Sequence, residues 1–126
     1  MTLPSPAVLA LGLAVAVPAA ALAHHSFAMF DRTRTETVSG TVKSFEMINP
    51  HGWLRILVSG ADGRSAEWSF ETVGPPQLQR MGWTSTTVAV GDRVSVAAHP
   101  VRDGSFSGQL VSVTLADGRT LQAGRP

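Results

Sequence analysis

The feature that most constrains the fold is a hairpin signal around the turn Ala61-Asp62-Gly63, with alternating segments at 53–58 and 65–71. An Asp-Gly pair between such segments is typical of a type I turn with a G1 bulge, in which Gly takes the left-handed conformation. This turn pairs residues whose numbers sum to 124, as 54 and 70 do. The register places six apolar residues on one face of the hairpin: Leu54, Ile56, Val58, Ala66, Trp68 and Phe70. Turn chemistry and hydrophobic pattern therefore predict the same hairpin.

The opposite face of the hairpin carries Trp53, Arg55, Glu67 and Glu71. The register places Trp53 opposite Glu71, and it places Arg55 diagonally between the two glutamates, within reach of both for ion pairs. Glu71 has two interpretations: it binds a metal or orients an imidazole, or it pairs with Arg55. The sequence favours the ion pair.

Three further segments alternate like half-buried strands, at 37–47, 93–99 and 109–115. Gly74-Pro75-Pro76 ends the third strand, and Gln77–Met81 has the length of one or two helical turns, with Gly82 suited to the position after the helix. The residues expected to point inward in the later strands are Val94, Val96, Ala98, Val111, Val113 and Leu115.

Five strands with a short helix between the third and fourth match an all-β fold, the five-stranded OB-like Greek-key barrel. A small β-sandwich is the alternative that strand count and spacing allow. Residues 119–122 follow a second Asp-Gly turn and could add a short final strand. We therefore predict a barrel domain over residues 36–126, preceded by an arm over residues 24–35.

The chain opens with an uncharged apolar segment, 1–23, that ends in Ala21-Leu22-Ala23. Small residues at 21 and 23 fit the pattern that a signal peptidase recognises, so we expect export and cleavage before His24. The apolar segment is too short and too rich in Ala to hold as a membrane span, and nothing later resembles one. The sequence therefore predicts a periplasmic or secreted protein.

The chain has ten basic and nine acidic residues and no cysteine. This near balance provides no positive field to attract nucleic acid and no polybasic segment to hold a membrane surface. The lack of cysteine excludes disulfides and thiolate metal sites together. Any metal site must therefore use nitrogen and oxygen ligands.

Cleavage before His24 would create a chelator, because the new α-amino group and the His24 imidazole can bind one metal ion together, with His25 beside them. OB-folds bind ligands on the outer face of strands 2 and 3, between the loops that join strands 1 to 2 and 4 to 5. Those loops are expected at 49–52 and 99–108. This places His51, His99 and Asp103 on one rim.

Several short motifs together resemble a known family: His24-His25-Ser26-Phe27, Asn49-Pro50-His51, Glu67-Trp68 with Glu71, and Arg102-Asp103-Gly104. The chain is similar over essentially its whole mature length to domain-of-unknown-function family six-one-five-two, a group of small exported bacterial proteins. The resemblance implies a periplasmic location and no activity, and its motifs can equally be folding determinants.

We expect a Cu(II) site formed by His24 with His25 or His51, with zinc as the competing metal. A carrier or sensor is more economical than a copper oxygenase for so small a domain. A hydrolase is not supported, because no nucleophile motif or phosphate-binding glycine loop is present. The alternative is a metal-free ligand-binding or envelope-interaction module that uses Trp53 and Arg55. The arm should enter at the barrel end opposite His51, so His24 would have to run back about 33 Å, the length of a ten-residue strand.

Overall fold

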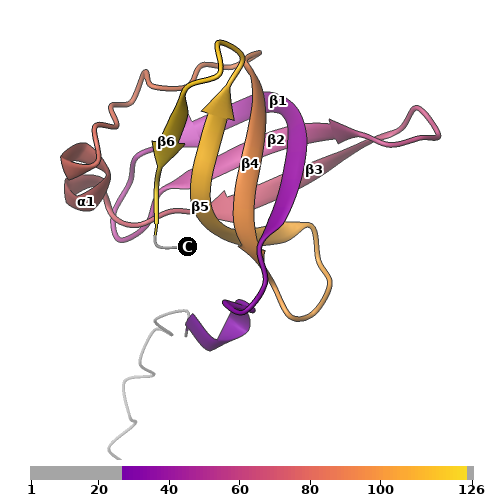
Figure 1. Ribbon diagram of the computed structural model, residues 1–126, viewed down its shortest axis with the longest axis horizontal. Helices are drawn as coiled ribbons and strands as arrows, with labels where there is room; N and C mark the ends of the chain where they lie inside the picture. The colour runs from indigo at the N-terminus through magenta and orange to yellow at the C-terminus, as the bar shows by residue number, and fades with distance from the viewer. Residues whose placement is uncertain (1–26, 125–126) are drawn as a thin grey trace, which may run out of the picture.

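The computed structural model describes residues 27–124, which form a closed β barrel with one short helix beside it (Figure 1). The elements in chain order are η1 (Phe27–Met29), β1 (Glu36–Glu46), β2 (Trp53–Ser59), β3 (Ser65–Glu71), α1 (Pro75–Arg80), β4 (Arg93–Pro100), β5 (Ser107–Leu115) and β6 (Thr120–Gln122). This confirms the predicted all-β class and the short helix between the third and fourth strands. No helix in this part of the chain has the length and apolar character needed to cross a membrane.

The barrel closes through a short parallel pairing between β3 and β5. The strand order is β3-β2-β1-β4-β5-β6, and residues 69–71 of β3 pair in parallel with residues 107–109 of β5. Five strands thus form the closed OB-like barrel. Strand β6 pairs with residues 112–114 of β5 and lengthens the sheet there. Ser107 Oγ reinforces the closure because it donates a 2.9 Å hydrogen bond to the Ser69 carbonyl oxygen.

Strand β1 reaches both halves of the barrel because it changes partner midway. Residues 36–41 pair with β4 and residues 41–46 pair with β2, with a bulge between Val42 and Ser44. Bulges bend a strand and increase its twist, which is what closing a small sheet on itself requires. Gly40 lies at the change of partner, where a Cβ would clash with the Leu57 carbonyl oxygen.

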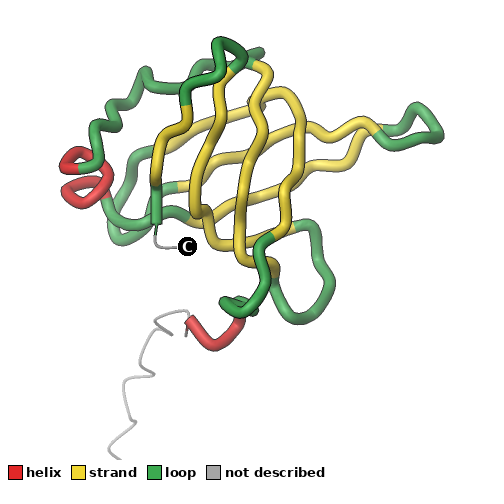
Figure 2. The backbone as a smooth tube through the Cα atoms, viewed as in Figure 1, coloured by secondary structure: helices red, strands yellow, loops and turns green. Residues whose placement is uncertain are grey.

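The β2–β3 hairpin has the predicted register, and its turn has the predicted geometry. Leu54 pairs with Phe70, and all seven cross-strand pairs sum to 124. Gly63 has φ +78° and donates its amide hydrogen to the Gly60 carbonyl oxygen at 3.1 Å, as a type I turn with a G1 bulge requires. The hairpin extends well beyond the barrel wall, ending in a loop that Figure 2 shows in green.

The predicted apolar face of this hairpin is correct, but its burial is uneven. Leu54, Ile56 and Phe70 are fully buried, whereas Val58, Ala66 and Trp68 are only partly buried. The three less buried residues lie in the half of the hairpin that extends past the β3–β5 pairing. There β3 pairs with β2 alone, so these side chains lie outside the closed part of the barrel.

One inward position in β5 differs from the prediction. The main core cluster contains Leu110 and Val113, with Leu115 packed against it, but not Val111. The ladder pairs Ala97 with Ser112 and Ala98 with Leu110, so Val111 is the extra residue of a bulge. Because the bulge shifts the alternation by one residue, Leu110 takes the inward position and Val111 is buried elsewhere.

The barrel end next to α1 is closed by Trp83, the largest fully buried side chain. Its indole Nε1 donates a 2.7 Å hydrogen bond to the Gln122 carbonyl oxygen, and its ring lies 5.4 Å from that of Phe45. Helix α1 starts at Pro75, two residues before the predicted start, because proline suits the first turn of a helix. Gly82, with φ +92°, follows the helix as predicted.

Candidate functional site

Barrel closure brings polar residues from four strands into one row, which we call the polar row: Trp53, Glu71, Gln109 and His99. Trp53 pairs with Glu71, Glu71 with Gln109, and Gln109 with His99. Directly paired residues present their side chains on the same face of a sheet. Here that is the outer face, because the next residues, Phe70 and Ala98, are in the core.

Two members of the polar row are buried although the row lies on the outside of the barrel, and Trp53 and Gln109 are partly buried. Glu71 and His99 are 6% and 2% exposed, and with Thr72 they are the buried polar or charged residues found within 27–124. The side-chain oxygen Oε1 of Gln109 is also buried, and it has no hydrogen-bond partner in the described part of the chain. Buried polar groups without full compensation are costly, so such a concentration marks the first candidate site.

His51 lies beside this row, in the loop between β1 and β2. Its Nδ1 is 3.1 Å from the Thr72 carbonyl oxygen and 3.7 Å from Glu71 Oε1. A carbonyl oxygen can only accept, so Nδ1 carries the hydrogen and the neutral ring has its lone pair on Nε2. Metal-binding imidazoles are commonly oriented in this way, by a carbonyl or carboxylate on the opposite ring nitrogen.

His99 has the same arrangement in a different setting. Its Nδ1 donates to the Arg34 carbonyl oxygen at 2.7 Å, which again leaves the lone pair of the neutral ring on Nε2. The prediction that His99 belongs to the loop between the fourth and fifth strands is wrong. Strand β4 continues to Pro100 and β5 begins at Ser107, so the loop covers only residues 101–106 and His99 lies in the sheet.

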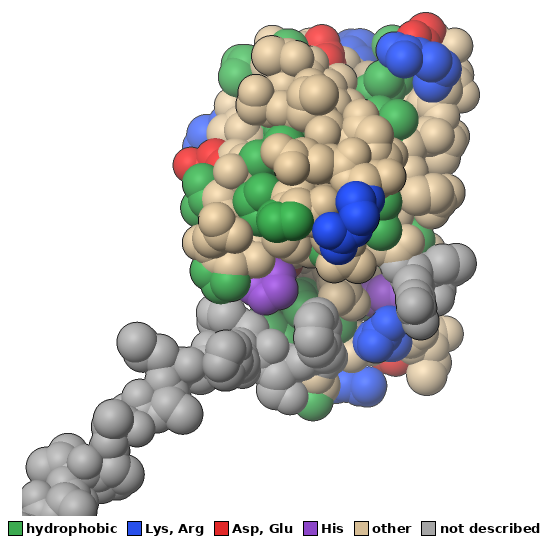
Figure 3. Space-filling view, turned by 90° about the vertical axis from the view of Figure 1, so that its left-hand side faces the viewer, with side chains coloured by type: hydrophobic (Ala, Val, Ile, Leu, Met, Phe, Trp, Pro, Cys, Tyr) green, Lys and Arg blue, Asp and Glu red, His purple; other side chains and the backbone are tan. Residues whose placement is uncertain are grey.

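The two described histidines, His51 and His99, face the same side of the molecule. Figure 3 shows histidine side chains in two places on one face. The His51 side chain is 34% exposed, which leaves it accessible, whereas that of His99 is buried. His24 and His25, the other predicted ligands, lie outside the described residues. Within 27–124, no group of three or more His, Cys, Asp or Glu side chains is placed to hold a metal ion.

Closure of the barrel gives the arm a shorter route to His51 than the predicted one along the length of a strand. Phe30 forms a bridge with Val101, and the Asp31 amide donates to the Pro100 carbonyl oxygen. The arm is therefore held against the two residues that follow His99 in the chain. Along the curved sheet, Trp53 is about 16 Å from Val101, two residues along β4 and three strand spacings away. The six residues from His24 to Phe30 span up to about 20 Å. His24 therefore does not need to run back along the barrel.

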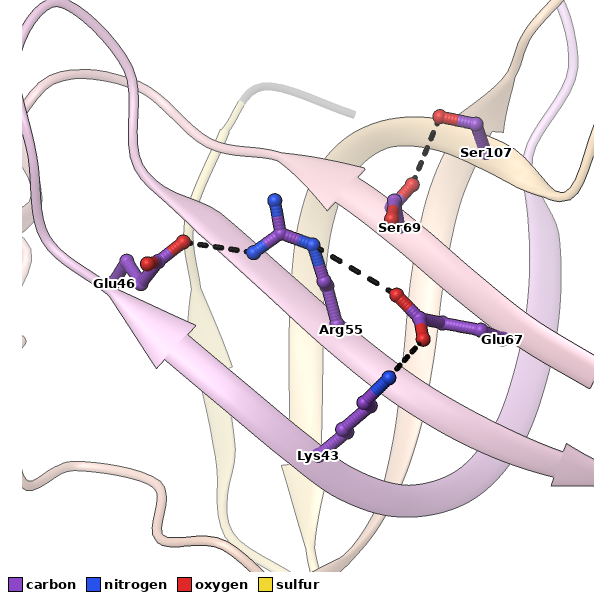
Figure 4. Close-up of polar contacts among 6 residues, drawn as sticks. All are labelled: Lys43, Glu46, Arg55, Glu67, Ser69 and Ser107. Atoms are coloured by element: carbon purple, nitrogen blue, oxygen red, sulfur yellow. Dashed lines mark hydrogen bonds and ion pairs between the residues drawn. The ribbon is translucent and has the colours of Figure 1, made fainter.

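The outer face of β1, β2 and β3 carries a chain of ion pairs (Figure 4). Lys43 pairs with Glu67, and Arg55 contacts Glu67 at 3.9 Å and Glu46 at 2.7 Å. The Arg55 guanidinium also lies 5.8 Å from the ring centre of Trp53. The expected pair between Arg55 and Glu71 is wrong, because Glu46 at the end of β1 takes the Arg55 guanidinium and Glu71 faces His51.

Asp103 has a local role in the β4–β5 loop. Its Oδ1 accepts a 2.9 Å hydrogen bond from the Ser105 amide, and hydrogen bonds from Ser105 lower the pKa of the Asp103 carboxyl below its usual value of 3.8. This bond fixes the turn at Gly104, which has φ +77°. Asp103 is therefore not part of the polar row, and its role is to stabilise a turn.

Sequence reasoning did not single out Gln109, Thr72 or Arg34. Gln109 joins the site through the β3–β5 pairing, which links residues almost forty positions apart, and no local pattern reports such a pairing. Thr72 and Arg34 contribute backbone carbonyl oxygens, which are independent of side-chain identity.

Fold and site together define a class: a small closed barrel of OB-like topology with a partly buried polar row on its outer face. The chain belongs to the family of unknown function DUF6152, whose family model matches residues 12–111. No curated protein matches the chain. Among solved structures, the chain is similar to the mitochondrial single-stranded DNA binding protein Rim1 from S. cerevisiae, with 17% identity and a TM-score of 0.48. That match covers 72% of this chain and 97% of Rim1.

Proposed function

We propose that the protein is exported, is cleaved before His24, and then binds Cu(II) as a periplasmic or secreted carrier or sensor. The His24 amine and imidazole bind the ion, and His25 or His51 completes a mainly nitrogen site. One observation carries this proposal: the accessible His51 ring has its Nδ1 directed at the Thr72 carbonyl oxygen and at buried Glu71. An imidazole held in this way on Nδ1 has the orientation common among metal-binding histidines, which supports His51 as a ligand.

The choice of copper follows from the available donor atoms. Nitrogen and oxygen ligands in a tetragonal arrangement favour Cu(II), which binds such ligands most tightly among the common divalent ions. The chain has no cysteine to make a softer site. Zinc remains the competing metal, and copper is preferred because an amine and its own imidazole supply two adjacent donors of the tetragonal arrangement that Cu(II) favours.

The alternative function, a metal-free binding module centred on Trp53 and Arg55, has less support. The Arg55 guanidinium is already paired with Glu46 and Glu67 and lies near the Trp53 ring. These contacts account for the Arg55 guanidinium as a group that joins β1, β2 and β3.

The test compares Cu(II) binding by three proteins: the chain beginning at His24, the same chain with its His24 α-amino group acetylated, and His51→Ala. Isothermal titration against a competing chelator measures affinity, and electron paramagnetic resonance reports nitrogen coordination. We expect acetylation to weaken binding by at least about a hundredfold, because it removes the amine from the chelate. The acetylated chain is a matched control for histidine content, since it keeps all four histidines.

Binding should also weaken on acidification. An α-amino group titrates near pH 7.7 and an imidazole near pH 6.5 in simple peptides, and protons compete with the metal for the same nitrogens. Copper affinity should therefore fall steadily from about pH 8 to pH 6. Unchanged affinity after acetylation contradicts the terminal chelate, and unchanged affinity in both altered proteins favours the metal-free module.

A further inference from the structure

A second candidate site is a cavity of about 370 Å³ between the arm, the β4–β5 loop and β3. That volume falls within the range of small-ligand sites. The side chains that matter for its chemistry are Asp31, Arg34, Glu36, Trp68, Arg102 and Phe106.

The aromatic part of this cavity is a fixed stack. Trp68 lies between Phe70 in the core and Phe106 in the loop, with ring centres 6.2 Å and 5.0 Å away. The two outer residues differ sharply, because Phe70 is fully buried and Phe106 is 57% exposed. The stack therefore presents an aromatic surface to solvent on a base that the core holds in place.

The polar part of the cavity carries charges of both signs in equal number. Arg34 Nη2 lies 2.6 Å from Glu36 Oε1, and Arg102 Nη1 lies 3.9 Å from Asp31 Oδ1. Hydrogen bonds from Thr33, with further help from Arg102, lower the pKa of the Asp31 carboxyl, which keeps it an acceptor at neutral pH. The rim thus offers guanidinium donors and carboxylate acceptors side by side but no net charge to attract an ion.

The loop that carries Phe106 is held by backbone hydrogen bonds at both ends. The Ser69 amide donates to the Phe106 carbonyl oxygen at 3.1 Å, and the Arg102 amide donates to the Met29 carbonyl oxygen at 3.0 Å. Arg102 Nε also donates to the Ala28 carbonyl oxygen at 3.1 Å. A loop fixed in this way loses little conformational entropy when a ligand binds.

We propose that this cavity binds a neutral saccharide, which packs the apolar face of one ring on Phe106, backed by Trp68, and bonds its hydroxyl groups to the paired charges around them. Sugar hydroxyls both donate and accept, so they match a rim of alternating donors and acceptors better than an anion or a cation does. The proposal is independent of the metal site, because none of the cavity's side chains is a proposed copper ligand.

The test is a nuclear magnetic resonance titration of the purified protein, without metal, against four neutral disaccharides: cellobiose, maltose, lactose and diacetylchitobiose. Benzoate and glucuronate serve as the aromatic-anion and charged-sugar probes. We expect at least one disaccharide to shift the amide signals of residues 101–106 and Ser69 saturably at millimolar concentrations. Phe106→Leu, which keeps an apolar cover but removes the flat ring, should weaken that binding about tenfold.

Val90→Ala is the matched control, because Val90 is 75% exposed, lies outside the cavity and should leave binding unchanged. The proposal is overturned if no disaccharide shifts these signals, if benzoate or glucuronate shifts them more strongly, or if Phe106→Leu binds as the native protein does. An unchanged spectrum away from the loop shows that Phe106→Leu is folded.

Discussion

At the scale of single residues, Glu71 is the most unusual side chain in the barrel wall. A carboxylate on the outer face of a sheet is normally solvated, yet Glu71 is 6% exposed and its ion-pair partner is His51 at 3.7 Å. Glu67, four residues earlier on the same face, is exposed and pairs with Lys43. Glu71 is therefore a buried carboxylate held in one orientation, whereas Glu67 is an ordinary surface carboxylate.

We predict that Glu71→Gln weakens Cu(II) binding about tenfold or more while the protein stays folded, because residues that orient a ligand tune its basicity. This prediction rests on the proposed metal site. Glu67→Gln is the control, since it makes the same charge change on the same strand and face. Chelator competition measures affinity, and circular dichroism confirms the fold. Equal affinity of the two variants would restrict Glu71 to a structural role.

At the scale of elements, β1 determines whether the barrel can form. It pairs first with β4 and then with β2, and Gly40 lies at the change, against the β2 backbone at Leu57. The neighbouring Ser39 points outward and is exposed. Adjacent positions in one strand therefore have opposite tolerance for a larger side chain.

We predict that Gly40→Ala lowers the free energy of unfolding by about 1–3 kcal/mol, because its methyl group must displace the Leu57 backbone. Ser39→Ala should change it by less than about 0.5 kcal/mol, as exposed substitutions usually do. Urea denaturation of both variants measures the difference. A Gly40→Ala midpoint equal to that of the native protein would show that the strand crossing has more room than the structure indicates.

At the scale of the whole molecule, the proposed function depends on where the mature chain begins. The barrel fixes the arm at Phe30, and the histidines at 24 and 25 precede this anchor by six and five residues. An uncleaved leader would leave no free amine at His24. Processing and metal binding are therefore linked.

We predict that the mature protein begins at His24, because Ala21 and Ala23 fit the small-residue cleavage pattern. Intact-mass measurement of the periplasmic fraction tests this. Ala23→Phe should block cleavage, whereas Leu22→Phe, at the unconstrained position between the two alanines, should not. A mature mass that corresponds to any other first residue would remove the terminal chelate.

The sequence by itself determined the elements and the hairpin register. Alternation is a local property, and the Asp-Gly turn at 62–63 links two strands by geometry that its own residues specify, so the pairs summing to 124 could be predicted. The inward faces of β2, β3 and β4 followed from the same alternation. The bulge at Val111 could not be predicted, since one extra residue leaves no compositional mark.

Only the tertiary structure decided which polar residues meet. Closure of the barrel through residues 69–71 and 107–109 places Glu71 beside Gln109 and His99 and fixes the arm near them. It also gives Arg55 a partner in Glu46 rather than in Glu71, and it sets Phe106 against Trp68. These contacts join residues that are distant in the chain, and their pairing depends on how the whole sheet curves, which no local pattern encodes.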